Sequence, residues 1–226
     1  MHKGHSFLEM PKGIKALFTD TKPNTAMFKV VQMMGGAGST TPAPILLPGV
    51  ERWSLNALIR MRASGGRFTG VTRWFDTHPR EYIAKRKEGD MWGWYRQLLI
   101  PVYLTKTYED LPTSVAYPLQ EVQASFGGTR LFCSGLDYML ALAAYEQFDE
   151  IQLYGFRLNH PNYRHQVGSA AWWLKQCRDR GIVITFLSPC AAAKANVVDA
   201  LPPKPEAHHL MYGFETTDRG LLYHGR

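Results

Sequence analysis

The chain has few cysteines and no long apolar run, and these shortages exclude several classes of protein. Its three cysteines, Cys133, Cys177 and Cys190, are an odd number without C-x-x-C spacing, so we expect neither a disulfide framework nor a zinc ribbon. The longest apolar stretches, such as residues 45–47 and 139–144, are short, whereas a membrane helix needs about 20 apolar residues. The N-terminal residues lack the apolar core of a secretory signal. We therefore expect a cytoplasmic protein with reduced thiols and no membrane partner.

Acidic residues are outnumbered by basic ones. The 226 residues include 26 Lys and Arg against 19 Asp and Glu, which gives a formal net charge of +7. The excess is spread over separate clusters, at residues 60–67, 80–87 and 178–180. A basic surface suits a phosphorylated ligand or a nucleic acid, although a protein with a merely basic surface has the same composition.

Stretches typical of strands alternate along the chain with stretches typical of helices. We predict strands at 28–34, 51–55, 67–75, 100–104, 130–133, 150–156 and 182–187, and helices at 57–62, 81–99, 136–147 and 166–180. Such alternation implies right-handed crossovers and a mostly parallel sheet. The sequence therefore predicts an α/β fold, a Rossmann-like three-layer sandwich formed by a single domain at 27–200, with an N-terminal arm at 1–26 and a C-terminal tail at 201–226.

The tail carries three aromatic residues, Tyr212, Phe214 and Tyr223. We expect them to dock on the body of the domain. We also expect removal of the tail after Leu201 to weaken solubility more than chemistry.

A glycine-rich turn follows the first predicted strand. In open parallel sheets, ligands bind outside the carboxyl ends of the strands, and glycine N–H groups can there surround phosphate oxygens. The turn offers the candidate ligand-binding residues Gly35, Gly36, Gly38, Ser39 and Thr40. It matches neither G-x-G-x-x-G nor a Walker A motif with its lysine, so a plain glycine turn is the alternative.

Polar residues also follow the second and third predicted strands. Asn56 can hydrogen-bond a base or a ribose, and Asp76 with His78 can orient a hydroxyl or ligate a metal. The alternative for Asp76–Pro79 is an Asx-type turn that leads into a helix.

The predicted helix at 136–147 begins with a capping box, S-x-x-D, formed by Ser134 and Asp137. Ser134 and Gly135 place a hydroxyl and free amides at the positive end of the helix dipole, where an anion can bind. Capping alone explains Ser134 equally well.

Cations, imidazoles, a phenol and an amide crowd the loop after the penultimate strand. The candidates are Arg157, His160, Tyr163, Arg164, His165 and Gln166. His160 or His165 could act as general acid or base, and an arginine could neutralise a leaving phosphate. A single histidine is more often structural, and the spacing of these two gives little support for a metal site.

The chain resembles a Rossmann-like group that includes bacterial sialyltransferase-like glycosyltransferases, archaeal 6-hydroxymethylpterin diphosphokinases and virus-encoded relatives. The likeness lies in the Gly35–Ser39 turn, in Asn56 followed by Arg73–His78, in 134–155 and in Tyr163–Gln166. Met211–Glu215 is similar to the viral relatives, and a virus-encoded protein would work in the host cytoplasm.

The resemblance implies a transferase that holds a nucleotide diphosphate or a nucleotide-sugar between the first glycine turn and the Ser134 helix. One position departs from the pattern: relatives usually carry an aspartate where this chain has Arg157. The change puts metal dependence in doubt and favours an anionic ligand.

Three functions are compatible with these residues. The first is a nucleotide-sugar-dependent glycosyltransferase with His160, His165 and Asp76 as catalytic candidates, which modifies a nucleic-acid base, for example in viral DNA, or another polar acceptor. The second is an ATP-dependent diphosphokinase, which would need Mg²⁺ and has Asp76 as its one obvious carboxylate. The third is a non-catalytic protein that binds a nucleotide or a nucleic acid. The sequence does not predict an oligomeric state.

Overall fold

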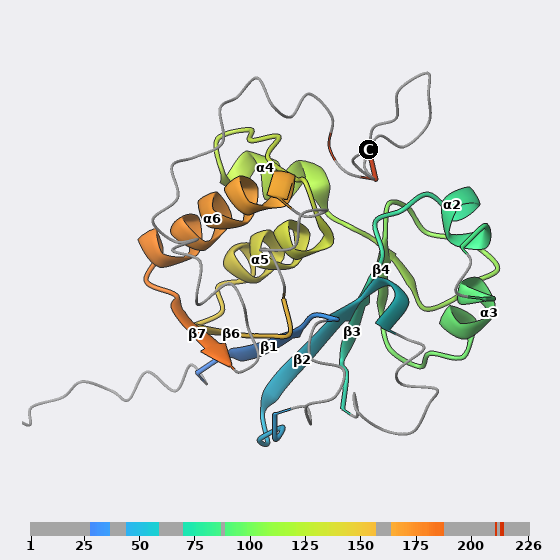
Figure 1. The fold of residues 1–226 in the computed structure, drawn as a ribbon, viewed down its shortest axis with the longest axis horizontal. Coiled ribbons are helices and arrows are strands. Elements are labelled where there is room, and N and C mark those ends of the chain that lie inside the picture. The colour runs from blue at the N-terminus through green and yellow to red at the C-terminus, as the bar shows by residue number, and fades with distance from the viewer. Residues whose placement is uncertain are drawn as a thin grey trace, which may run out of the picture.

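A computed structural model describes residues 28–36, 44–58, 70–86, 89–156, 164–187, 211, 213 and 214, with the backbone alone at 57, 164 and 165. Its strands are β1 (Val30–Met34), β2 (Val50–Leu55), β3 (Arg73–Phe75), β4 (Val102–Leu104), β5 (Ser114–Ala116), β6 (Glu150–Tyr154) and β7 (Val183–Leu187). They form one seven-stranded sheet in the order β5-β4-β3-β2-β1-β6-β7 (Figure 1). Every pair of neighbouring strands is parallel.

Helices cover both faces of this sheet. They are α2 (Arg80–Ala84), α3 (Met91–Arg96), α4 (Leu119–Ser125), α5 (Gly135–Tyr145) and α6 (Arg164–Asp179), with a short 3-10 helix at Asn56–Leu58. Figure 1 shows α4, α5 and α6 together on one side, and α2 and α3 on the other. The α/β class, the three layers and the parallel sheet are thus confirmed. No helix in the described ranges combines the length and the apolar character needed to cross a membrane.

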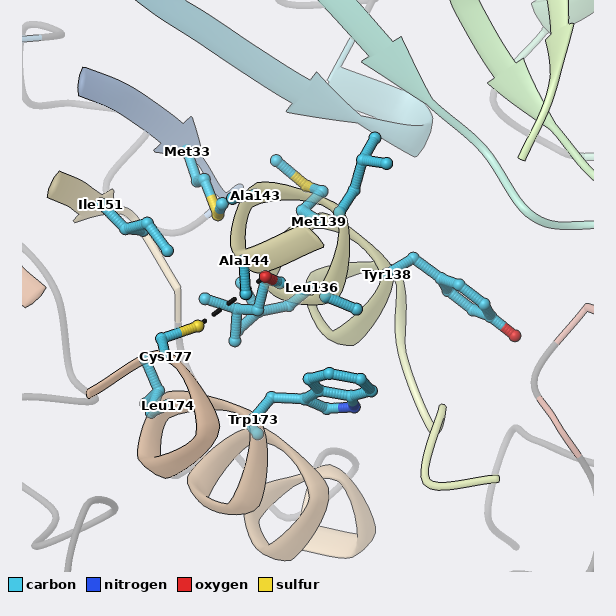
Figure 2. Packing of buried hydrophobic residues seen from close by; sticks show 14 of the residues in the cluster. Met33, Leu136, Tyr138, Met139, Ala143, Ala144, Ile151, Trp173, Leu174 and Cys177 are labelled. Carbon is cyan, nitrogen blue, oxygen red and sulfur yellow. Dashed lines mark hydrogen bonds between the residues drawn. The ribbon is translucent and has the colours of Figure 1, made fainter. Parts of the chain in front are cut away.

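The larger core lies between the sheet and helices α5 and α6 (Figure 2). Adjacent strand residues point to opposite faces, so Met33 enters this core while Met34 enters the smaller one beneath α2 and α3. Trp173 of α6 is fully buried, and its indole N–H donates to the Leu131 carbonyl over 2.6 Å. The Cys177 thiol is also buried, which raises its pKa to about 12. This core holds α5 firmly against the sheet.

A row of polar side chains sets the register of the central strands. Arg52, 2% exposed, donates from Nε and Nη2 to Gln32 Oε1 over 3.1 and 2.8 Å. Gln32 Nε2 then donates to Gln152 Oε1 over 3.0 Å. These residues are direct partners across β2, β1 and β6. A shift of one residue would break the row, so the row fixes where these three strands end.

The prediction of a strand at 130–133 is wrong. These residues are irregular because other groups satisfy their backbone: Cys133 N–H donates to Asp137 Oδ2 over 2.7 Å, and the Leu131 carbonyl accepts from Trp173. The remaining strand of the sheet is instead β5, which lies with α4 in a stretch for which the sequence pattern predicted neither a strand nor a helix.

The single helix predicted at 81–99 is also wrong, because the chain forms α2 and α3. Gly89, with a φ of 109°, separates them, and Asp90 caps α3 by accepting from Gly93 N–H over 2.8 Å. The third strand is shorter than predicted, since residues 70–72 precede β3. The arm at 1–26 lies outside the described residues, and the domain boundaries stay a prediction.

Candidate functional site

The order of the strands reverses at β1. The chain runs from β1 through β2 to β5 on one side of the sheet and returns to place β6 on the other side of β1. In a parallel sheet, the connections at such a point leave the carboxyl ends of the two central strands in opposite directions and open a crevice between them. The carboxyl ends of β1 and β6 are therefore where a ligand is expected.

Two glycine residues meet at this point. Gly35 N–H donates to the Tyr154 carbonyl over 2.7 Å, and a methyl group on Gly35 would lie 2.5 Å from the Gly155 carbonyl oxygen. Packing of one backbone against the other thus requires glycine at 35, whether or not a ligand binds. Gly36 is exposed at the end of β1, and a methyl group there would lie 3.2 Å from Leu58 Cδ2.

Asn56, at the end of β2, has a left-handed backbone with a φ of 50°. Residues other than glycine rarely adopt this conformation, and asparagine tolerates it better than most. A methyl group on Gly135 would lie 3.8 Å from Asn56 Nδ2, which places the amide beside the first turn of α5. A strained polar residue at a strand end suggests a functional site.

Helix α5 begins as the S-x-x-D pattern predicts. Ser134 Oγ accepts from Asp137 N–H over 3.4 Å. Gly135 lets the helix approach β2 closely, because a methyl group at this position would lie 2.8 Å from Leu55 Cδ1. First-turn amides, here those of Gly135 and Leu136, have no acceptor within the helix. Ser134 and Gly135 are buried in this arrangement, as the close approach of Gly135 to Leu55 requires.

Asp137 places a carboxyl with an unusually high pKa at the start of α5. Burial raises the pKa of this carboxyl to about 7, although hydrogen bonds from Ser169, Cys133 and Ser134 act to lower it. Oδ2 accepts from Ser169 Oγ over 2.8 Å, while Oδ1 has no hydrogen-bond partner among the described residues. Near neutral pH this carboxyl is therefore protonated in a fraction of the molecules. Its average negative charge beside the helix N-terminus is correspondingly smaller.

Asp76 and His78, after β3, belong to a buried polar cluster. Asp76 Oδ1 lies 2.5 Å from His78 Nδ1 and accepts from His78 N–H, and Oδ2 accepts from Tyr95 O–H over 2.5 Å. Arg86 Nη2 lies 3.2 Å from both imidazole nitrogens. The imidazole also stacks on Tyr82, with 4.7 Å between ring centroids. Residues from α2, α3 and the loop between them thus hold the pair in one geometry.

This cluster keeps Asp76 ionised. Burial acts to raise the pKa of Asp76, but attraction to His78 and Arg86, with hydrogen bonds from His78 and Tyr95, outweighs it and leaves the pKa below its ordinary value. Both carboxylate oxygens accept hydrogen bonds from the protein. The side chains of Asp76 and His78 are 0% and 3% exposed, so a substrate reaches neither in this arrangement.

The structure brings several predicted residues to one edge of the sheet. Leu55 pairs with Phe75, so Asn56 and Asp76 follow neighbouring strands at the same level. Gly35, Asn56 and Gly135 lie at the ends of β1 and β2 and at the start of α5. Asp76 and His78 lie one strand further along and turn toward α2 and α3.

Other predicted residues are outside the described part of the chain. These are Gly38, Ser39 and Thr40 of the glycine turn, Arg157, His160 and Tyr163 of the polar loop, and the side chains of Arg164 and His165. Gln166 lies half-buried in the first turn of α6. The roles of all these residues stay predictions.

Three residues of this region were not predicted from the sequence. Gly155 directly follows β6, and a glycine at a strand end was a signal that could have identified it. Tyr95 reaches the Asp76 cluster from α3 and Arg86 reaches it from the loop after α2, and no local pattern connects them to it.

Within the described ranges, no three His, Cys, Asp or Glu side chains gather closely enough to hold a metal ion. If a phosphate bound at this edge, the groups of the described residues that could contact it are backbone amides and the side-chain amide of Asn56.

No protein-family model and no curated protein matches this chain. Among solved structures, the fold is similar to that of the sialyltransferase CstII from Campylobacter jejuni in complex with a substrate analogue, cytidine-5'-monophosphate. That match has a TM-score of 0.48 and 15% sequence identity, and covers 80% of this chain and 97% of the other.

Proposed function

We propose that the protein is a transferase that uses a nucleotide-sugar donor and binds the donor phosphates between the Gly35–Gly36 turn and the start of α5. One observation carries the proposal: the strand order reverses between β1 and β6, and the N-terminus of α5 packs on the end of the neighbouring strand β2. Such a point supplies amide donors and a positive helix end together. An anion is the ligand that this combination suits best.

The remaining parts of the donor have candidate partners at the same edge. The Asn56 side chain, held beside Gly135, offers both a donor and an acceptor to a ribose or a base. Burial raises the pKa of Asp137 to about 7, so partial protonation of this carboxyl weakens its repulsion of a phosphate at the helix N-terminus.

In the proposed reaction, the bond between the anomeric carbon and the phosphate oxygen breaks, and an acceptor oxygen bonds to that carbon. The acceptor proton passes to a base, for which His160 or His165 is our candidate. The leaving phosphate keeps the bonding electrons and is stabilised by the helix end. The net charge of +7 favours an anionic acceptor such as a nucleic acid.

A diphosphokinase ranks second. Its magnesium ion would need carboxylate oxygens, and both oxygens of Asp76 already accept hydrogen bonds from His78 and Tyr95. Catalysis by Asp76 itself would require the buried cluster to open. A non-catalytic binder would share the same edge and differ only in its lack of turnover.

The test is a thermal-shift screen against nucleoside mono-, di- and triphosphates and nucleotide-sugars, each with and without magnesium. A bound ligand stabilises the folded state by about 2.7 kcal/mol at a concentration 100 times its Kd. Stabilisation by a nucleotide-sugar or its nucleotide product without metal supports the proposal and names the donor. Stabilisation by ATP with magnesium alone would favour the diphosphokinase, and no stabilisation by any nucleotide would overturn the proposed donor site.

Two variants locate the site once a ligand is found. Ser134→Ala should reduce the ligand-induced shift, and Ser125→Ala should not, because Ser125 lies on α4 and donates to the Glu121 carbonyl over 3.0 Å. Loss of the Ser134 cap costs about 1 kcal/mol by itself, so the comparison uses the shift that the ligand causes in each variant. Equal shifts in both variants would place the ligand elsewhere.

A further inference from the structure

Three C-terminal residues, Met211, Gly213 and Phe214, pack against the body of the protein; Figure 1 draws them in red near the label C. We call them the C-terminal contact. Met211 is 7% exposed and belongs to the larger core. The Gln123 side-chain amide donates to Met211 Sδ over 3.3 Å. Phe214 N–H donates to the Met211 carbonyl over 3.1 Å and closes a turn.

Gly213 lies directly on the turn that follows β3. Its φ is 82°, and a methyl group on it would lie 1.7 Å from the carbonyl oxygen and 2.6 Å from the carbonyl carbon of Thr77. No side chain fits at that distance. Thr77 lies between Asp76 and His78 in the chain, so Gly213 packs against the backbone segment that carries both members of the buried pair.

Phe214 joins the same contact to α5. Its ring lies 5.5 Å from that of Tyr138 and 6.3 Å from that of Tyr117, measured between centroids. Tyr117 O–H donates to the Tyr138 carbonyl over 3.0 Å. The C-terminal contact therefore connects the turn after β3 to the helix whose N-terminus forms one wall of the candidate site.

We propose that the C-terminal contact is a positioning element of the site, in which Gly213 holds Thr77 and thereby fixes the Asp76–His78 pair relative to α5. The expected effect of the tail on solubility stays a prediction, and the packing of these three residues adds a proposed role in the site. Only the consequence for ligand binding rests on the proposed function, since the contact itself is geometric.

The Asp76–His78 pair is sensitive to any displacement of the Thr77 backbone. His78 Nδ1 lies 2.5 Å from Asp76 Oδ1, and Arg86 bounds the same ring at 3.2 Å. Hydrogen bonds weaken steeply once distance and angle depart from their optimum. A side chain at position 213 must either move the Thr77 carbonyl or leave the contact, and both outcomes change the surroundings of His78.

The test compares Gly213→Ala with Gly181→Ala. Both glycines have a similar φ, 82° and 81°, but a methyl group on Gly181 would meet nothing within 4 Å. The two variants therefore share the backbone strain and differ in the clash. The NMR signals of the His78 imidazole, assigned with a His78→Gln variant, are recorded for both full-length variants and the wild type.

We expect Gly213→Ala to move the His78 imidazole signals, and Gly181→Ala to leave them at their wild-type positions. Unchanged His78 signals in folded Gly213→Ala would overturn the proposal. Should Gly213→Ala fail to fold, the same spectra of Phe214→Ala decide, since loss of the ring contact with Tyr138 should also shift these signals.

Binding supplies a second readout. For a nucleotide found in the thermal-shift screen, we expect the Kd to rise on the order of tenfold in Gly213→Ala, about 1.4 kcal/mol, because the neighbouring Phe214 packs on Tyr138 of α5, the helix whose N-terminus is the proposed phosphate site. Gly181→Ala should keep the wild-type Kd. If the wild type binds no nucleotide, the proposed function fails, whereas the His78 spectra still test the positioning role.

Discussion

Asn56 and Gln147 are the two described residues other than glycine that have a positive φ. Gln147 follows α5 on the surface, where a left-handed residue simply ends a helix. Asn56 ends a strand inside the candidate site, beside Gly135. The sequence indicated that Asn56 carries a hydrogen-bonding amide at a strand end, but it did not indicate the left-handed backbone, which depends on the contact between β2 and α5.

Replacement of Asn56 by glycine separates the amide from the backbone conformation. Asn56→Gly should keep or raise the melting temperature, since glycine adopts a positive φ without strain. Nucleotide binding should weaken about tenfold, the effect of one lost hydrogen bond. Gln147→Gly, the matched control, should show a similar change in stability and an unaltered Kd. Wild-type affinity in Asn56→Gly would remove this residue from the site.

Asp137 makes stability depend on pH near neutrality. Because burial raises its pKa to about 7 in the folded protein, the folded state binds more protons than the unfolded chain. This contribution is complete below the ordinary pKa of an aspartate and is lost as the pH rises through about 7. The wild type should lose roughly 1 kcal/mol or more of unfolding free energy between about pH 5 and pH 8.

Denaturant titrations at several pH values measure this loss. Asp137→Asn should flatten the pH dependence, whereas Asp179→Asn, at a half-exposed position on α6, should leave it as in the wild type. A wild-type slope that persists in Asp137→Asn would assign the titration to another group.

At the scale of elements, local pattern predicted the long units well and the short ones poorly. Helices α5 and α6 and strands β1, β2, β6 and β7 lie where periodicity and capping placed them. The expected strand at 130–133 failed because the side chains of Asp137, four residues after Cys133, and of Trp173, 42 residues after Leu131, occupy its backbone groups. Strand β5 and helix α4 are short, and the residues beside them, Pro112, Thr113 and Pro118, are typical of a loop.

The close contact between the ends of β1 and β6 also could not be predicted from local sequence pattern. Sequence alone assigned Gly35 to a ligand turn, whereas its lack of a side chain is needed for contact with Gly155. Gly35→Ala should therefore destabilise the protein by about 2 kcal/mol or more, through overpacking against a backbone carbonyl. Gly36→Ala, whose methyl group would meet the movable end of Leu58 at 3.2 Å, should cost about 1 kcal/mol or less. Similar losses in urea unfolding would contradict the assigned packing.

For the whole molecule, the position of the candidate site follows from topology. Sequence pattern predicted a parallel sheet and polar residues at its strand ends, and the strand order then joins the ends of β1, β2 and β6 with α5. The C-terminal contact could not be predicted, because nothing near Gly213 in the sequence indicates that it touches Thr77. Contacts between residues so far apart in the chain arise only from the complete fold.

The central claim is that the carboxyl edge of β1, β2 and β6 binds a nucleotide donor. Hydrogen exchange with and without the ligand from the thermal-shift screen tests it most directly, because bound amides exchange more slowly. The account predicts protection in peptides that cover Gly35–Gly36, Asn56 and Ser134–Asp137. Protection confined to other regions, such as the basic segment at 80–86, would contradict it.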